Sequence, residues 1–256
     1  MTAVSNGGVL VSTGLDAIVY AAQGIVRRRF SWTEFFEQCW FLVSVTLLPA
    51  ILIAFPVAFV IVLEVGTLAT SIGASQVVGA VDGQATIGQI APIVAALLLS
   101  GAGGTAMTAD LGARNIRDEL AALEVMGIDP VERLVAPRVV AMVVIAFFLN
   151  WFTAFVGILA GYIADIFVLN GTSGGFLGSF SEFSQVSDVF QSIMKSVVFG
   201  MFAGTIACYK GLTVKAGAAG VGEAVKESVV INGICLFLAD VVITQIFLTV
   251  FPLKAL

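Results

Sequence analysis

Residues 139–163 read VVAMVVIAFFLNWFTAFVGILAGYI, a run of mostly apolar residues without a charged side chain. An α-helix rises about 1.5 Å per residue, so about 20 residues cross the ~30 Å hydrocarbon core of a bilayer. This run is long enough to cross, and it carries too little polarity to face water on any side. It therefore predicts a membrane-spanning helix.

Four more segments have the same length and character. The five predicted spans are residues 41–63, 87–107, 139–163, 190–209 and 229–251. Pro49 and Pro56 lie within the first span, and we expect a bend there because a proline removes a backbone donor from the helix. The pattern predicts an all-α integral membrane protein with one membrane domain over residues 31–256.

The composition excludes several classes of function. Of 256 residues, 59% are hydrophobic and 11% are charged, whereas soluble domains carry about 25% charged residues. The chain contains no histidine, which excludes Ser-His-Asp and Cys-His catalysis and the common histidine-ligated zinc sites. It also lacks the G-x-x-x-x-G-K-[ST] phosphate loop. A globular enzyme in water is excluded, and so is ATP binding by the usual loop.

The residues before the first span form a separate N-terminal region, residues 1–30. Residues 15–30 are mildly amphipathic and end in three consecutive arginines, which favours a helix lying at the membrane surface. An unstructured tail remains the alternative. No basic region of a cleavable signal peptide precedes it, so we expect the N-terminus to be retained. Ser31 and Glu34 have the spacing of a capping box and predict a new helix from there.

The distribution of cations predicts the orientation. Ten of the twelve lysines and arginines precede span one or lie between spans two and three or four and five: Arg27, Arg28, Arg29, Arg114, Arg117, Arg133, Arg138, Lys210, Lys215 and Lys226. The loops at 64–86 and 164–189 contain none. By the positive-inside rule, the N-terminus lies in the cytoplasm and the C-terminus on the outer, periplasmic side of the plasma (inner) membrane.

Small residues recur at the spacing with which helices pack in lipid. Gly157 and Gly161 form a G-x-x-x-G pair in the third span, and Gly200 and Gly204 form another in the fourth. The spacing fits packing inside one chain and packing between two chains equally well.

The loop between spans two and three has a distinct pattern. Residues 109–138 read ADLGARNIRDELAALEVMGIDPVERLVAPR. Ile116, Leu120 and Leu123 fall on one helical face, and Gly127 is placed to end that helix with a left-handed cap. Asp129 and Pro130 then begin another helix. The pattern predicts a cytoplasmic helix over about 113–127. By pattern alone, a helix resting on the membrane surface is equally good.

Two ionisable residues lie inside predicted spans. Asp240 falls near the middle of the fifth span and Lys195 near the start of the fourth. A charge there costs several kcal/mol unless it is paired or neutral. We therefore predict that Asp240 faces the interior of the bundle and that Lys195 is its partner.

Four segments carry a resemblance to a known family. They are APIVAALLLSGAGGTAMTADLGA (91–113), LEVMGIDPVERLVAPR (123–138), KSVVFG (195–200) and YKGLTVKAGAAGVGEAV (209–225). The chain resembles the MlaE/YrbE permeases, and most of all the YrbE subunits of actinobacterial Mce systems. These are membrane subunits of ABC transporters that move lipids with MCE proteins. The resemblance implies an interfacial helix, five spans and a cytoplasmic coupling helix.

The resemblance also implies a function and partners. The chain would move a fatty acid, mycolate-type lipid or sterol across the inner membrane, and two separate ABC ATPase subunits would bind ATP and magnesium. The chain itself would be no enzyme and would hold no cofactor, metal or nucleic acid. A homologous permease subunit and MCE-domain proteins, expected as a hexamer, would complete the complex.

Site residues follow from the same resemblance. The coupling helix would dock in a groove of the ATPase through residues Arg114, Arg117, Glu119, Leu120, Leu123, Glu124, Met126, Gly127, Asp129 and Pro130. The lipid would contact an apolar stripe late in span one and the start of span two, at Ile61, Val65, Leu68, Ile72 and Ile90. An apolar stripe of this kind also fits a helix that simply faces lipid.

Two positions depart from the family pattern. Ala102 stands where many members have an arginine, and Gln89 stands where they have an acidic residue. The loss of both polar anchors implies one specialised half of a heterodimer.

Three other classes of function remain for comparison. A secondary transporter working alone would show an inverted repeat and several midplane carboxylates, which the sequence lacks. A non-transporting scaffold subunit remains open. An intramembrane enzyme would need a nucleophile, and Ser173 within GTSGG is interpreted instead as part of a turn.

Overall fold

The computed structural model describes residues 31–215 and 217–250. Within these ranges the backbone forms helices, turns and bends and no strand. The predicted surface helix at 15–30 lies outside the described residues, as does residue 251 at the end of the fifth predicted span.

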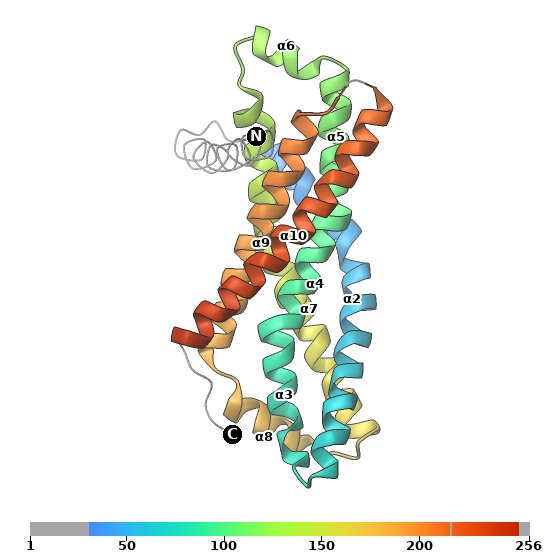
Figure 1. The fold of residues 1–256 in the computed structure, drawn as a ribbon, viewed down its shortest axis with the longest axis vertical. Helices are drawn as coiled ribbons and strands as arrows, with labels where there is room; N and C mark the ends of the chain where they lie inside the picture. Colours follow the sequence, from blue (N-terminus) through green and yellow to red (C-terminus); the bar gives the residue numbers. More distant parts are fainter. Residues whose placement is uncertain (1–30, 216, 251–256) are drawn as a thin grey trace. The chain divides into compact units, whose positions relative to one another are not determined.

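Five helical stretches are long and apolar enough to cross a membrane (Figure 1). They are Trp32–Ser71, Val78–Ile116, Val131–Phe167, Val186–Leu212 and Ala218–Val250. The prediction of an all-α protein with five spans is confirmed, and the chain is a multi-pass membrane protein. Each stretch is longer than the predicted span because its helix continues into polar sequence beyond the apolar run. The first, α2 (Trp32–Ser71), continues through both prolines.

The second stretch is built from five pieces. These are α3 (Val78–Ala85), the π-helical turn η2 (Thr86–Ile90), α4 (Ala91–Leu98), the π-helical turn η3 (Leu99–Gly103) and α5 (Gly104–Ile116). A short 3₁₀ turn, η1 (Ser75–Val77), precedes α3. π-turns inside α-helices are rare and occur frequently at functional sites.

The remaining elements follow in chain order. They are α6 (Glu119–Val125), the π-helical turn η4 (Val131–Val135), α7 (Ala136–Phe167), α8 (Ser173–Phe183), α9 (Val186–Leu212) and α10 (Ala218–Val250). The chain divides into two compact units. The described part of the first unit comprises residues 31–46, 96–146 and 197–239, and that of the second comprises 47–95, 147–196 and 240–250.

In the first unit, α9 packs closely against α7. A Cβ atom added at Gly200 would lie 2.9 Å from the Cα of Val143, and one at Gly204 would lie 3.2 Å from the Cα of Val139. In the second unit, a Cβ at Gly157 would lie 2.6 Å from the Cγ2 of Thr86. The glycines at four-residue spacing therefore serve packing inside the chain.

The second unit contains a helix between spans three and four that the sequence analysis did not predict. Thr172 caps α8, because its hydroxyl oxygen accepts a hydrogen bond from the N–H of Gly175 at 3.2 Å. Ser173 is the first residue of this helix, so its assignment to a turn was wrong. α8 lies against α3 (Figure 1), where a Cβ at Gly79 would lie 2.7 Å from the Oγ of Ser179.

We expect Gly79→Val to separate α3 from α8. The added side chain would also lie 2.9 Å or less from the backbone of Phe176, which cannot rotate away, and overpacking of this kind costs about 1–3 kcal/mol. Thermal unfolding of the purified protein in detergent should show a lower Tm. Gly178→Val on α8 is the control, since a Cβ there meets nothing within 4 Å. Equal Tm values for both variants would contradict the packing.

Candidate functional site

The stretch at 113–127, predicted as one helix, is divided between the end of α5 and the separate helix α6. α5 ends at Ile116, and Asp118 takes a left-handed backbone conformation with φ of 57° before α6 begins. The side-chain amide of Asn115 donates to the carbonyl of Leu212 at 2.9 Å, which fixes the end of α5. The continuous helix predicted over 113–127 is therefore wrong, because the apolar periodicity carries no sign of this break.

Both ends of the link from α6 to η4 are capped. Gly127 has φ of 74°, its N–H donates to the carbonyl of Glu124 at 2.9 Å, and the N–H of Ile128 donates to that of Leu123 at 2.9 Å. These two hydrogen bonds together form a Schellman cap. Asp129 Oδ1 accepts from the N–H of Val131 at 2.8 Å, which begins the next helical turn. α6 is therefore a short helix with a fixed end.

One face of α6 is buried in the first unit. Leu120 belongs to a buried apolar cluster with Leu111, Leu134, Val135, Val139 and Cys208, and Leu123 packs against it. Ile116 was predicted on the same face but is exposed, because the break at Asp118 turns it away. Leu120 therefore holds α6 in place and is unavailable to a partner.

The other face and the C-terminal end of α6 are exposed. Val125 is 89% exposed, Met126 64% and Ile128 40%. We call these three residues the α6 apolar patch. Among the ten predicted coupling residues, those that are exposed are Arg117, Glu119, Glu124, Met126, Gly127 and Asp129, whereas Arg114 and Leu123 are half-buried and Pro130 is buried like Leu120. The sequence analysis missed Val125 and Ile128.

A buried arginine connects three helices of the first unit. Arg138 is fully buried, and its Nη2 lies 2.6 Å from Glu34 Oε1 and 2.8 Å from Asp110 Oδ2. Its Nη1 donates to the carbonyl of Leu134 at 3.0 Å. Glu34, predicted as the acid of a capping box, thus pairs with a cation on α7. The sequence analysis used Arg138 only to orient the chain, and no local pattern marks its partners.

The structure brings Lys195 and Asp240 together in the second unit. The Nζ of fully buried Lys195 lies 2.7 Å from Asp240 Oδ1. It also donates to Gln89 Oε1 at 2.8 Å and to the carbonyl of Gly88 in η2 at 3.0 Å. The amide of Gln89 donates to the hydroxyl of Thr244 at 3.3 Å. An ammonium has three donors, and this one has three acceptors from two elements, η2 and α10.

The five residues predicted to form a lipid-binding stripe do not share one exposed surface. Ile61 and Val65 are half-buried on α2, Leu68 is 67% exposed, and Ile72 is 80% exposed just beyond the end of α2. Ile90, predicted to face them, is buried within η2. The structure therefore does not bring Ile90 to an exposed surface with the other four.

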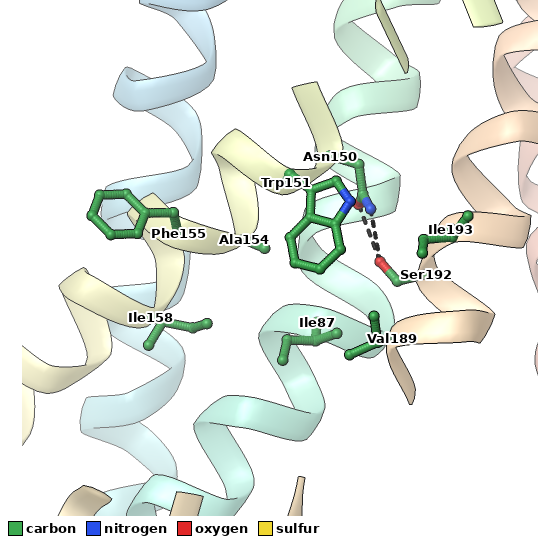
Figure 2. Close-up of a pocket in the computed structure, with 9 residues that line it drawn as sticks. All are labelled: Ile87, Asn150, Trp151, Ala154, Phe155, Ile158, Val189, Ser192 and Ile193. Atoms are coloured by element: carbon green, nitrogen blue, oxygen red, sulfur yellow. Dashed lines mark hydrogen bonds between the residues drawn. The ribbon is translucent and has the colours of Figure 1, made fainter. Parts of the chain in front are cut away.

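An apolar pocket of about 170 Å³ lies elsewhere in the second unit. Figure 2 shows its lining residues from η2, α7 and α9: Ile87, Asn150, Trp151, Ala154, Phe155, Ile158, Val189, Ser192 and Ile193. Asn150 and Ser192 are buried and hydrogen-bond each other in both directions, at 2.9 and 3.2 Å. None of the five predicted lipid-binding residues lines this pocket.

Comparison with known proteins identifies the family. The family model described as permease MlaE matches residues 35–246, which covers the five spans except for the first three residues of α2 and the last turn of α10. The chain belongs to the MlaE permease family. The resemblance stated from the four motifs is confirmed at this level, and the narrower likeness to actinobacterial YrbE subunits stays a prediction.

Several MlaE relatives match part of their length. A probable ABC transporter permease protein of Synechocystis sp. is 34% identical over 66% of this chain and 64% of its own length. One of Rickettsia typhi is 30% identical over 63% and 62%. Protein trigalactosyldiacylglycerol 1, chloroplastic, of Arabidopsis thaliana is 29% identical over 70% of this chain and 51% of its own length. The match thus spans less than two thirds of each of these relatives.

Removing one member of the Lys195–Asp240 pair should destabilise this MlaE chain strongly. Lys195→Met leaves a buried carboxylate without its cation, and breaking a buried pair in this way costs about 3–5 kcal/mol. The double variant Lys195→Met/Asp240→Leu removes both charges and should recover much of that loss. Chemical unfolding in detergent micelles gives the free energies of unfolding of the wild type, of Lys195→Met, of Asp240→Leu and of the double variant. If the effects of the two single substitutions simply add in the double variant, the two residues do not interact.

Gly127→Val should loosen the end of α6 without creating a clash. A Cβ at Gly127 meets nothing within 4 Å, so the penalty of about 1 kcal/mol arises from the left-handed backbone alone. Amide hydrogen exchange of residues 119–125 should accelerate about fivefold. Gly222→Val, equally unobstructed but without a positive φ, is the control. Unchanged exchange in Gly127→Val would show that α6 does not depend on this cap.

Proposed function

We propose that the chain is the permease subunit of an ABC transporter that moves lipids across the plasma membrane, driven by two separate ATPase subunits. The observation that carries this proposal is the α6 apolar patch. It lies in the segment that, by its resemblance to the MlaE permeases, we propose as the coupling element, and one face of α6 is anchored in the first unit.

The patch has the character of a protein-docking surface. Each apolar side chain removed from water contributes about 1.5–3 kcal/mol, so three exposed ones favour a partner that covers them. Exposed charges at Arg117, Glu119, Glu124 and Asp129 lie near the patch along the chain. An apolar centre with a polar rim is the usual anatomy of an interface, and the charges would oppose burial of this face in hydrocarbon.

The contacts of α6 offer a route for mechanical coupling. The buried cluster beneath it takes residues from α5, η4, α7 and α9, and thus joins three spans. Arg138 extends the connection to α2 through Glu34. Movement of α6 by an ATPase would therefore be passed to four spans through buried contacts rather than through flexible loops.

The distribution of cations supports the orientation with α6 in the cytoplasm. Among the described residues there are eight lysines and arginines, and seven of them belong to the first unit. The exception is Lys195, which is buried in its ion pair. By the positive-inside rule, this distribution supports the proposal that α6 lies on the cytoplasmic side, in line with the orientation expected from the sequence.

Our proposals for the lipid substrate and for the other partners are based on similarity to related proteins. The Arabidopsis relative carries the name of a galactolipid, trigalactosyldiacylglycerol. By the resemblance to YrbE subunits we propose a fatty acid, mycolate-type lipid or sterol as substrate, MCE-domain proteins as partners, and a heterodimer with a homologous permease. The apolar stripe at Ile61, Val65, Leu68 and Ile72, half-buried at its first two residues and exposed at its last two, remains the proposed lipid-contacting surface.

Met126→Asp should weaken ATPase binding while leaving the fold intact. It places a charge in the centre of the α6 apolar patch, and we expect about tenfold less ATPase to co-purify, equivalent to about 1.4 kcal/mol. Val125→Asp should act in the same direction. Val186→Asp is the control, because Val186 is 86% exposed and lies in the second unit. Leu120→Asp is unsuitable, since Leu120 is buried and its loss would unfold the site.

Lipid transfer by the same complexes separates the competing functions. Loss of ATPase binding together with lipid transfer supports the transporter. If Met126→Asp leaves ATPase binding and lipid transfer unchanged, the coupling role of α6 is wrong. If the wild-type chain co-purifies with no ATPase, a scaffold or an independent secondary transporter becomes the better account.

A further inference from the structure

We propose that the pocket between η2, α7 and α9 (Figure 2) binds one acyl chain of a membrane lipid. This site is separate from the stripe on α2, and the proposal depends on the membrane location of the chain rather than on lipid transport. Its support comes from the volume of the pocket, the chemistry of its wall and the medium at its mouth.

The volume limits the occupant to something narrow. At about 170 Å³, the pocket is close in size to an apolar cavity of ~150 Å³ that accommodates benzene. Sites for drug-sized molecules, the size class of a fused-ring sterol, measure about 300–1,000 Å³. A segment of one acyl chain fits this space, and a sterol ring system does not.

The wall of the pocket is mainly apolar. Its polar groups are Asn150 and Ser192, which make the two hydrogen bonds to each other drawn in Figure 2, and the indole N–H of Trp151. The other six lining residues are aliphatic or aromatic. A buried water needs two to four polar partners, and Asn150 and Ser192 already use part of their hydrogen-bonding capacity on each other. A hydrocarbon occupant needs none.

The mouth of the pocket opens to the surface at membrane depth. Trp151 is 47% exposed and Phe155 66% exposed, while Ala154 between them is buried. These residues lie in the middle of the charge-free run at 139–163. The medium around that run is the hydrocarbon core, so acyl chains are the ligands present at the mouth at the highest concentration.

We expect the pocket to bind an acyl chain weakly and to select it by its shape. An acyl chain that moves from the bilayer into the pocket leaves one apolar medium for another and gains no hydrophobic free energy. What it gains is close van der Waals contact with rigid walls, which falls quickly when the volume is altered. A change in pocket volume is therefore the sharpest way to test the site.

Photolabelling of the full chain in vesicles tests the proposal. The vesicles contain phosphatidylethanolamine, phosphatidylglycerol and a trace of phospholipid with a diazirine midway along one acyl chain. After illumination, peptides carrying lipid adducts are identified by mass spectrometry. We expect labelling of peptides that contain residues 151–155 and 189–193 to exceed that of the equally exposed face of α10 at Val241 and Val242.

Two variants change the pocket in opposite directions. Ala154→Phe fills it and should lower labelling of these peptides about tenfold, equivalent to about 1.4 kcal/mol of binding. Ile87→Ala widens it and removes wall contacts, so it should also lower labelling, which keeps the test open if Ala154→Phe fails to fold. Leu159→Phe is the matched control, because Leu159 is on α7, 45% exposed and outside the pocket. It should leave the labelling unchanged.

Three results would overturn the proposal. One is uniform labelling of all exposed helix faces, and another is labelling that neither pocket variant alters. The third is cross-linking of the pocket peptides to a second copy of the chain in place of lipid. A separate lipid-transfer measurement keeps the proposals apart, since labelling that responds to both variants supports the pocket even where no transfer is detected.

Discussion

A chain that crosses a bilayer five times must satisfy its polar groups without water, and this constraint explains the most informative contacts of the structure. The second unit contains a lysine whose three donors are all used by Asp240, Gln89 and a carbonyl of η2. The first unit contains an arginine held between Glu34 and Asp110. Each cation joins three elements, so the charges that are costliest to bury also connect helices far apart in sequence.

The same constraint explains which features of the fold and of the site could be predicted from the sequence. The five spans follow from apolar length alone, and Gly127 and Asp129 adopt the cap conformations typical of their residue types. Lys195 and Asp240 could be paired from sequence because few charges lie within the predicted spans. Arg138 could not, since it lies at the end of a span where several carboxylates were available to it. Its partners depend on tertiary packing.

The misses share one physical cause. The break at Asp118 and the start of α8 at Ser173 depend on single backbone conformations and single side-chain hydrogen bonds. Such local events leave no trace in hydrophobic periodicity. These local features changed the predicted site. The break at Asp118 leaves Ile116 exposed, and Leu120 packs into the buried cluster instead of facing a partner. The exposed residues Val125 and Ile128 became apparent only once the buried face of α6 was known.

The π-turn η2 affects how span two can be represented. It inserts one residue into a regular helix, and each residue of an α-helix advances by about 100° around the axis. A helical wheel drawn straight through residues 78–98 therefore assigns wrong faces to everything after the insertion. Ile90, at the last position of η2, is the first residue to which such a wheel assigns a wrong face. Deleting one residue of this turn should therefore restore a uniform helix and leave Pro92 and its successors on their present faces, because η2 already absorbs the extra residue within its own wider turn.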